Sequence, residues 1–106
     1  MSGQVRIGDG RVRLPRAICD RYFAGASSAA LLERDGEVYL VPLAGPSAGG
    51  LLLKQTNAQG DRVLLAPDFL AERGLGQFVA ERTFDVRWVD EAGALLIEGL
   101  GSSPTG

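Results

Sequence analysis

The chain of 106 residues contains no histidine. Without an imidazole, neither a Ser-His-Asp triad nor a Cys-His dyad can form, and zinc sites with histidine ligands are excluded. A histidine-based pH switch is excluded for the same reason. Because so few acid–base groups are in place, we expect the protein not to be an enzyme, and no motif points to a metal or a cofactor.

Cysteine occurs once, as Cys19, which excludes an intramolecular disulfide and a cysteine-cluster metal site. We expect Cys19 to be a small buried hydrophobe on a helix rather than a reactive thiol near Arg16. No apolar run approaches the length of a membrane span, and residues 1–15 lack the apolar segment of a signal peptide. A cytoplasmic protein with no membrane partner is therefore expected.

Charge is distributed unevenly along the chain, although the formal net charge is only −2. Residues 1–21 contain five arginines against two aspartates, a net charge of +3. Residues 51–106 contain five basic and eight acidic residues, a net charge of −3. This distribution fits solvated faces of mixed sign, or an anion-binding face formed by the N-terminal segment of an otherwise acidic protein.

The segment that follows the N-terminus predicts a β-hairpin. Apolar and polar residues alternate in 4–8 and again in 11–14, and Asp9-Gly10 between them favours a two-residue type I′ turn. Such a turn pairs Ile7 with Val12 and Arg6 with Arg13, so core residues oppose core residues. Because Arg6 and Arg13 are like charges directly opposed, and Arg11 shares their face, this face is a candidate anion site.

The remaining elements are also short and are separated by glycine, proline and aspartate. Pro15 begins a predicted helix over 16–23, and Asp35-Gly36 predicts a second type I′ hairpin between strands at 29–34 and 37–43. Residues 44–50 have the composition of a linker. After it we expect strands at 51–55 and 62–66, a helix at 68–73, and strands at 84–89 and 94–98, with 77–82 an extra strand or an irregular segment. Trp88 is expected in the core, and the tail 101–106 is expected to be disordered.

The two halves of the chain share one order of elements, strand–strand–helix–strand–strand. We therefore predict two ββαββ copies, residues 1–43 and 51–100, which share one core. Neither copy is large enough to bury its own apolar face. Interlocked, the two copies would form a small, mostly β barrel with two short helices, which removes exposed strand edges.

Residues 5–23, VRIGDGRVRLPRAICDRYF, followed by LLERDGEVYLVPL, resemble the AbrB/MazE/MraZ-like swapped-hairpin (SpoVT-AbrB) superfamily. The shared pattern is a strand, a turn ending in Gly-Arg, a strand ending in Leu-Pro, a short helix and a hairpin. The second half resembles the pattern more loosely, and tandem copies in one chain are similar to MraZ; the related double-psi barrels use similar repeats. The resemblance implies a cytosolic DNA-binding protein that directs these hairpins toward DNA.

The leading functional hypothesis is therefore a DNA-binding transcriptional regulator or antitoxin-like factor. The arginines expected to contact DNA are the hairpin residues and their neighbours, namely Arg6, Arg11, Arg13, Arg16 and Arg62. Asp61 beside Arg62, and Asp68 and Glu72 in the second helix, favour the alternative of a protein-interaction or assembly-accessory module on the same barrel. Arginines paired to acidic residues would favour that alternative, and a homodimer is compatible with either.

Overall fold

The computed structural model describes residues 2–43, 50–55 and 58–100, which together form eight strands and two helices. The first five elements are β1 (Ser2–Gly8), β2 (Arg11–Leu14), α1 (Arg16–Tyr22), β3 (Ser28–Arg34) and β4 (Glu37–Leu43). The next five are β5 (Leu51–Gln55), β6 (Arg62–Leu65), α2 (Pro67–Ala71), β7 (Arg82–Val89) and β8 (Ala94–Ile97). Of the predicted linker only Gly50 is described, and the predicted tail 101–106 lies outside the described residues.

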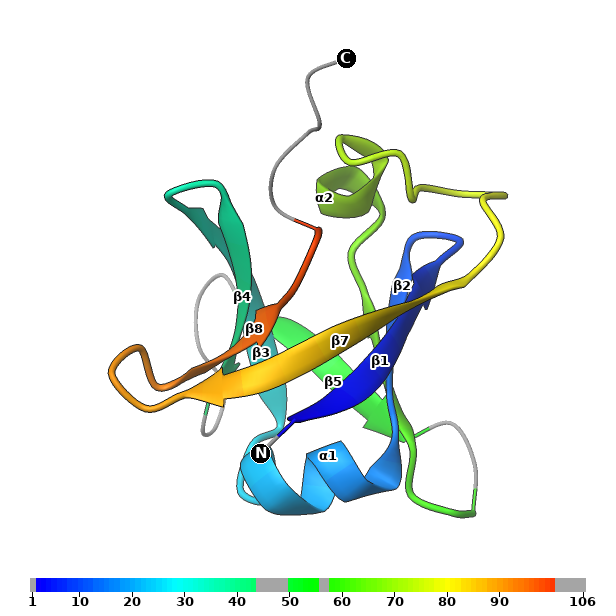
Figure 1. The fold of residues 1–106 in the computed structure, drawn as a ribbon. Helices are drawn as coiled ribbons and strands as arrows, with labels where there is room; N and C mark the ends of the chain where they lie inside the picture. The colour runs from blue at the N-terminus through cyan, green and yellow to red at the C-terminus, as the bar shows by residue number, and fades with distance from the viewer. Residues whose placement is uncertain (1, 44–49, 56–57, 101–106) are drawn as a thin grey trace.

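The strands close into an antiparallel barrel in the order β1-β2-β6-β5-β3-β4-β8-β7, which confirms the predicted fold class (Figure 1). Each predicted hairpin is a pair of neighbours in the barrel, but hairpins from the two halves alternate around it. The order is unchanged if β1, β2, β3 and β4 are exchanged with β5, β6, β7 and β8 respectively. The interpretation of the halves as two copies of one unit agrees with this order and stays a prediction.

Both predicted type I′ turns are present. Asp9 and Gly10 have φ values of 51° and 72°, and Asp35 and Gly36 have values of 53° and 78°. The register follows from them: Arg6 lies opposite Arg13, Ile7 opposite Val12, and Arg34 opposite Glu37. A two-residue turn with positive φ at both positions matches the twist of the strands that it joins, so the local register is fixed by the turn.

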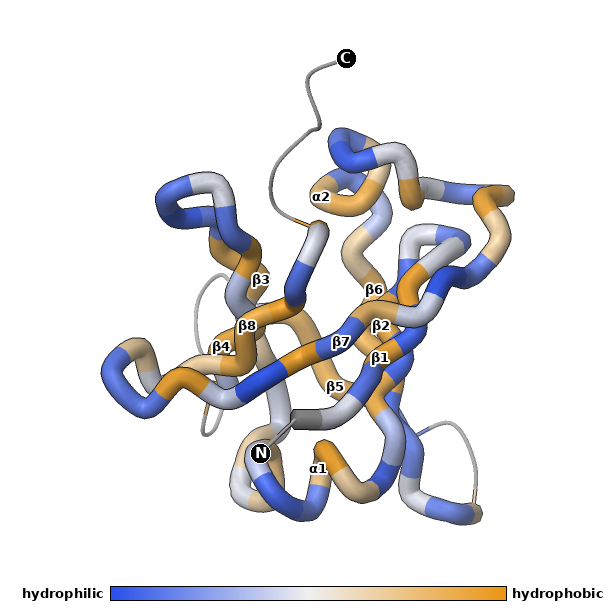
Figure 2. Tube along the Cα trace, viewed as in Figure 1, coloured by the Kyte–Doolittle hydropathy of each residue, from blue (hydrophilic) through white to orange (hydrophobic). Residues whose placement is uncertain are grey.

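The barrel interior is filled by the apolar side of each strand, which appears as orange segments along the strands in Figure 2. Its largest fully buried side chains include Phe23, Ile7, Leu14 and Leu40. Cys19 is buried, as expected from the sequence. Trp88 is only half-buried; its ring stacks on that of Tyr22 with the centroids 4.9 Å apart and packs against the core from one end.

The two short helices lie at opposite ends of the barrel (Figure 1). Near one end, α1 places Ile18 against Gly3; near the other, Pro67 at the start of α2 packs against the Asp9-Gly10 turn. Predicted boundaries coincide with the observed ones at twelve of the twenty helix and strand ends and differ by one or two residues at the other eight. Residues 72–81 contain turns but no strand, so the segment at 77–82 is irregular up to Arg82, where β7 begins. None of the helices among the described residues has the length and apolarity needed to cross a membrane.

Candidate nucleic-acid interface

Three of the predicted arginines lie together on the outer face of the β1–β2 hairpin. Side chains alternate between the two faces of a strand. Val5 and Ile7 on β1, and Val12 and Leu14 on β2, are buried in the core. Arg6, Arg11 and Arg13 therefore face outward, and Arg6 and Arg11 are exposed.

Strand pairing extends this basic face across two more strands. Arg13 lies opposite Val63 on β6, and Val63 lies opposite Lys54 on β5. Residues directly opposite one another share a face, so Arg6, Arg13, Val63 and Lys54 form one cross-strand row. With neighbouring strands about 4.8 Å apart, the row spans about 14 Å from β1 to β5. We call its cations, together with Arg11 in the next row, the basic stripe: Arg6, Arg11, Arg13 and Lys54.

Most of this charge is not neutralised within the chain. Arg13 forms an ion pair with Glu81, which precedes β7. Arg6, Arg11 and Lys54 form no ion pair with any residue of the described segments. Because Arg6 lies directly opposite Arg13, an anion bound between them would relieve their repulsion.

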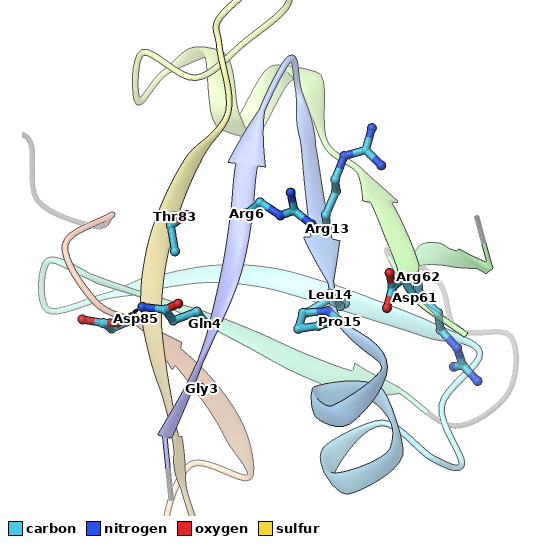
Figure 3. Close-up of a pocket in the computed structure, with 10 residues that line it drawn as sticks. All are labelled: Gly3, Gln4, Arg6, Arg13, Leu14, Pro15, Asp61, Arg62, Thr83 and Asp85. Atoms are coloured by element: carbon cyan, nitrogen blue, oxygen red, sulfur yellow. Dashed lines mark hydrogen bonds between the residues drawn. The ribbon is translucent and has the colours of Figure 1, made fainter. Parts of the chain in front are cut away.

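A pocket of about 650 Å³ lies beside the stripe (Figure 3). Arg6 extends across it toward β2, and Thr83 lies opposite Arg6 on β7. Carboxylates also line this pocket. Asp85 accepts a hydrogen bond of 3.0 Å from the Gln4 amide, and Asp61 accepts one of 2.8 Å from the Arg16 backbone N–H. The pocket is therefore of mixed charge, with Arg6 and Arg13 of the stripe and the two carboxylates among its lining residues.

The other two predicted arginines are not on the stripe. Arg62 lies opposite Leu14, so it starts on the inner side of the barrel, and its guanidinium donates a hydrogen bond of 2.9 Å to the Ala26 carbonyl. Arg62 is one of the residues that line the pocket, but in Figure 3 its guanidinium points away from Arg6 and Arg13. Arg16 is at the start of α1 and pairs with Asp20 at 3.2 Å. Arg16 and Arg62 are therefore not on the stripe, although Arg62 lines the pocket together with Arg6 and Arg13.

Lys54 was not predicted from the sequence. Its position beside the arginines depends on β6 lying between β2 and β5, a pairing between distant parts of the chain. The alternation of Leu53 and Lys54 indicates only that Lys54 faces outward from its own strand.

Cys19 lies on α1, and its thiol is held in the neutral form. Its Sγ donates to the Leu14 carbonyl oxygen at 3.6 Å. Burial raises the pKa of the Cys19 thiol above its ordinary value, and the nearby Arg62 guanidinium only partly offsets this effect. A thiol that stays protonated is a poor nucleophile.

We therefore expect Cys19 to react slowly with a thiol reagent in the folded protein. At about pH 8 the rate should be roughly tenfold or more below the rate in concentrated guanidinium chloride, because unfolding both exposes the thiol and lowers its pKa. Absorbance of the released thiolate measures both rates. Equal rates in the two conditions would contradict the assignment of a buried, neutral thiol.

The raised pKa also predicts a loss of stability at alkaline pH. The stabilisation from a protonated Cys19 is complete below the pKa of the unfolded thiol, and is lost as the pH rises through the higher pKa of the folded thiol. Urea unfolding across the alkaline range should therefore show a falling free energy of unfolding. In Cys19→Ser this alkaline loss of stability should be absent, because a serine hydroxyl does not titrate in that pH range.

Comparison of the chain with protein-family models, with curated proteins and with solved structures finds no match in any of the three. The resemblance to the swapped-hairpin superfamily thus stays a hypothesis that depends on the sequence motif. Among the residues that the structure describes, no three Cys, Asp or Glu side chains are grouped to hold a metal ion.

Proposed function

We propose that this protein binds DNA through the basic stripe and acts as a transcriptional regulator or antitoxin-like factor. The observation that carries the proposal is the row formed by Arg6, Arg13 and Lys54 on one outer face, with Arg11 beside it. Cations spread over about 14 Å can contact several phosphates of one duplex, since B-DNA carries a phosphate every 3.4 Å along each strand. Phosphate contacts would position the protein, and base contacts would supply any specificity.

The experiment is fluorescence anisotropy with duplex DNA from upstream of the gene itself, between about 50 and 200 mM salt. Four phosphate contacts per chain predict that log K falls against log salt with a slope of about −3 to −4. Arg11→Ala should weaken binding and reduce the slope by about one. The matched control is Arg34→Ala, which removes the same charge from the β3–β4 turn and should leave the slope unchanged.

Three results would count against all or part of the proposal. Failure of the wild-type protein to bind at about 50 mM salt would overturn it, because the electrostatic term is strongest there. Equal slopes for Arg11→Ala and the wild type would remove Arg11 from the interface. A slope changed by Arg34→Ala instead would place the DNA on a different face.

A protein-interaction module is the second candidate, and two observations favour it. Three of the five predicted arginines are engaged within the chain: Arg13 with Glu81, Arg16 with Asp20, and Arg62 with the Ala26 carbonyl. In addition, Leu32 and Leu52 are each more than half exposed on the outside of the barrel. The anisotropy experiment separates the candidates, because an interaction module predicts no DNA binding even at low salt.

A further inference from the structure

Phe78 is an exposed aromatic residue in the irregular segment between α2 and β7. It is 93% exposed, whereas Phe23 and Phe84 are buried and Phe69 is half-buried. Of the residues beside it in the chain, Gln77, Ala80 and Glu81 are exposed and none of them is a large apolar residue, whereas Val79 is partly buried and packs against the core. Phe78 is therefore the one large apolar side chain that is exposed in residues 77–81.

The backbone of Phe78 is strained as well as exposed. Its φ is 67°, in the left-handed region that glycine favours and that is an outlier for a bulky side chain. Such conformations persist where the surrounding structure imposes them, and they cluster at functional sites. Contacts from the surrounding structure must therefore hold Phe78 in this conformation.

The β1–β2 turn holds Phe78 in place. The Asp9 carboxylate accepts a hydrogen bond of 2.9 Å from the Phe78 backbone N–H. The Asp9 and Gly10 N–H groups in turn donate to the carbonyls of Val79 and Leu75, at 2.8 and 3.1 Å. The Asp9-Gly10 turn, which Arg11 follows, and the segment that carries Phe78 are therefore held together as one hydrogen-bonded unit.

This unit places a cation and an aromatic ring at the same end of the barrel. Arg11 directly follows the turn, is exposed, and makes no ion pair with the described residues. Arg13 on the same strand pairs with Glu81, three residues after Phe78. The turn and the Phe78 segment lie side by side in Figure 1, at the end of β1 and β2 away from α1.

We propose that Phe78 inserts at a base step of the duplex that the basic stripe binds, and partly unstacks it. This inference rests on the proposed DNA-binding function. Proteins that deform DNA insert apolar side chains, phenylalanine among them, between stacked bases while cations hold the phosphates. A protein-docking surface would instead present a contiguous apolar patch, but beside Phe78 in the chain the exposed side chains are small or polar and Val79 packs against the core.

The test uses the upstream duplex with 2-aminopurine in place of successive adenines, a base whose fluorescence rises when it is unstacked. Wild-type protein should raise the signal at one position. Phe78→Ala should abolish the rise and weaken binding by about tenfold, the effect of losing one aromatic stacking contact. The salt slope should not change, because no phosphate contact is lost. Phe78→Tyr keeps the ring and should behave as the wild type does.

A second variant separates binding from folding. Phe78→Gly also removes the ring but relieves the left-handed strain, so it should melt at a higher temperature than the wild type and still bind about tenfold more weakly.

If wild-type protein binds DNA and Phe78→Ala matches it in affinity and fluorescence, insertion is overturned and the basic stripe stands. Binding without any fluorescence rise also overturns insertion and leaves the stripe in place. If wild-type protein does not bind DNA at low salt, the DNA-binding function and the insertion both fail.

Discussion

Replacing Gly8 by alanine is expected to lower the free energy of unfolding by about 3 kcal/mol, at the upper end of the range for overpacked sites. A Cβ atom at Gly8 would lie 2.5 Å from Glu81 Cα, 2.7 Å from Glu81 N and 2.9 Å from the Ala80 carbonyl carbon. These are backbone atoms, so no side-chain rotation can make room. The segment before β7 would have to move away from the β1–β2 hairpin, and its hydrogen bonds to Asp9 would be disturbed.

Gly25→Ala is the matched control, because a Cβ atom at Gly25 would meet no other atom within 4 Å. Its effect on stability should stay within about 0.5 kcal/mol. Urea unfolding, followed by the fluorescence of Trp88, the single tryptophan, measures both variants. Equal midpoints for the two variants would show that residues 80 and 81 do not pack against β1 as described.

Phe23→Ala is expected to cost about 4 kcal/mol, within the range measured for truncating a buried phenylalanine. Phe23 ends α1, donates its N–H to the Cys19 carbonyl at 2.9 Å, and its side chain is fully buried in the core. Native domains have a total stability of about 5–15 kcal/mol, so this variant should lose a large share of it.

The control for Phe23→Ala is the same substitution at the exposed Phe78, which should change the free energy of unfolding by less than about 0.5 kcal/mol. Thermal unfolding followed by circular dichroism compares the two. A loss at Phe78 as large as that at Phe23 would mean that the Phe78 ring is buried in solution, and would remove the basis for its insertion into DNA.

The local structure could be predicted wherever a turn fixes it. Asp9-Gly10 and Asp35-Gly36 specify both turn type and register, so the pairings of Arg6 with Arg13 and of Arg34 with Glu37 were expected and are present. A two-residue turn leaves no freedom in which residues face each other. The same reasoning placed Arg11 on the face of Arg6 and Arg13.

Contacts between distant segments could not be predicted in this way. Lys54 joins the arginines because β6 lies between β2 and β5, and Arg62 is not on the stripe because it lies opposite the inward-facing Leu14. Hydrophobic alternation indicates the face of a strand but not its neighbour. The left-handed backbone of Phe78 also has no sequence signal, because the Asp9 carboxylate that holds it belongs to a turn far away in the chain.

The alternation of hairpins around the barrel has a consequence during synthesis on the ribosome. β1 has two neighbours, β2 directly after it and β7, where Gln4 meets Asp85 across a separation of 81 residues. At ordinary rates of translation, the second neighbour emerges roughly 4–16 s after β1. Until β7 emerges, one edge of β1 has no partner strand, and the nascent chain can misassemble through that edge. The barrel therefore cannot close around the first third of the chain until the last third has been synthesised.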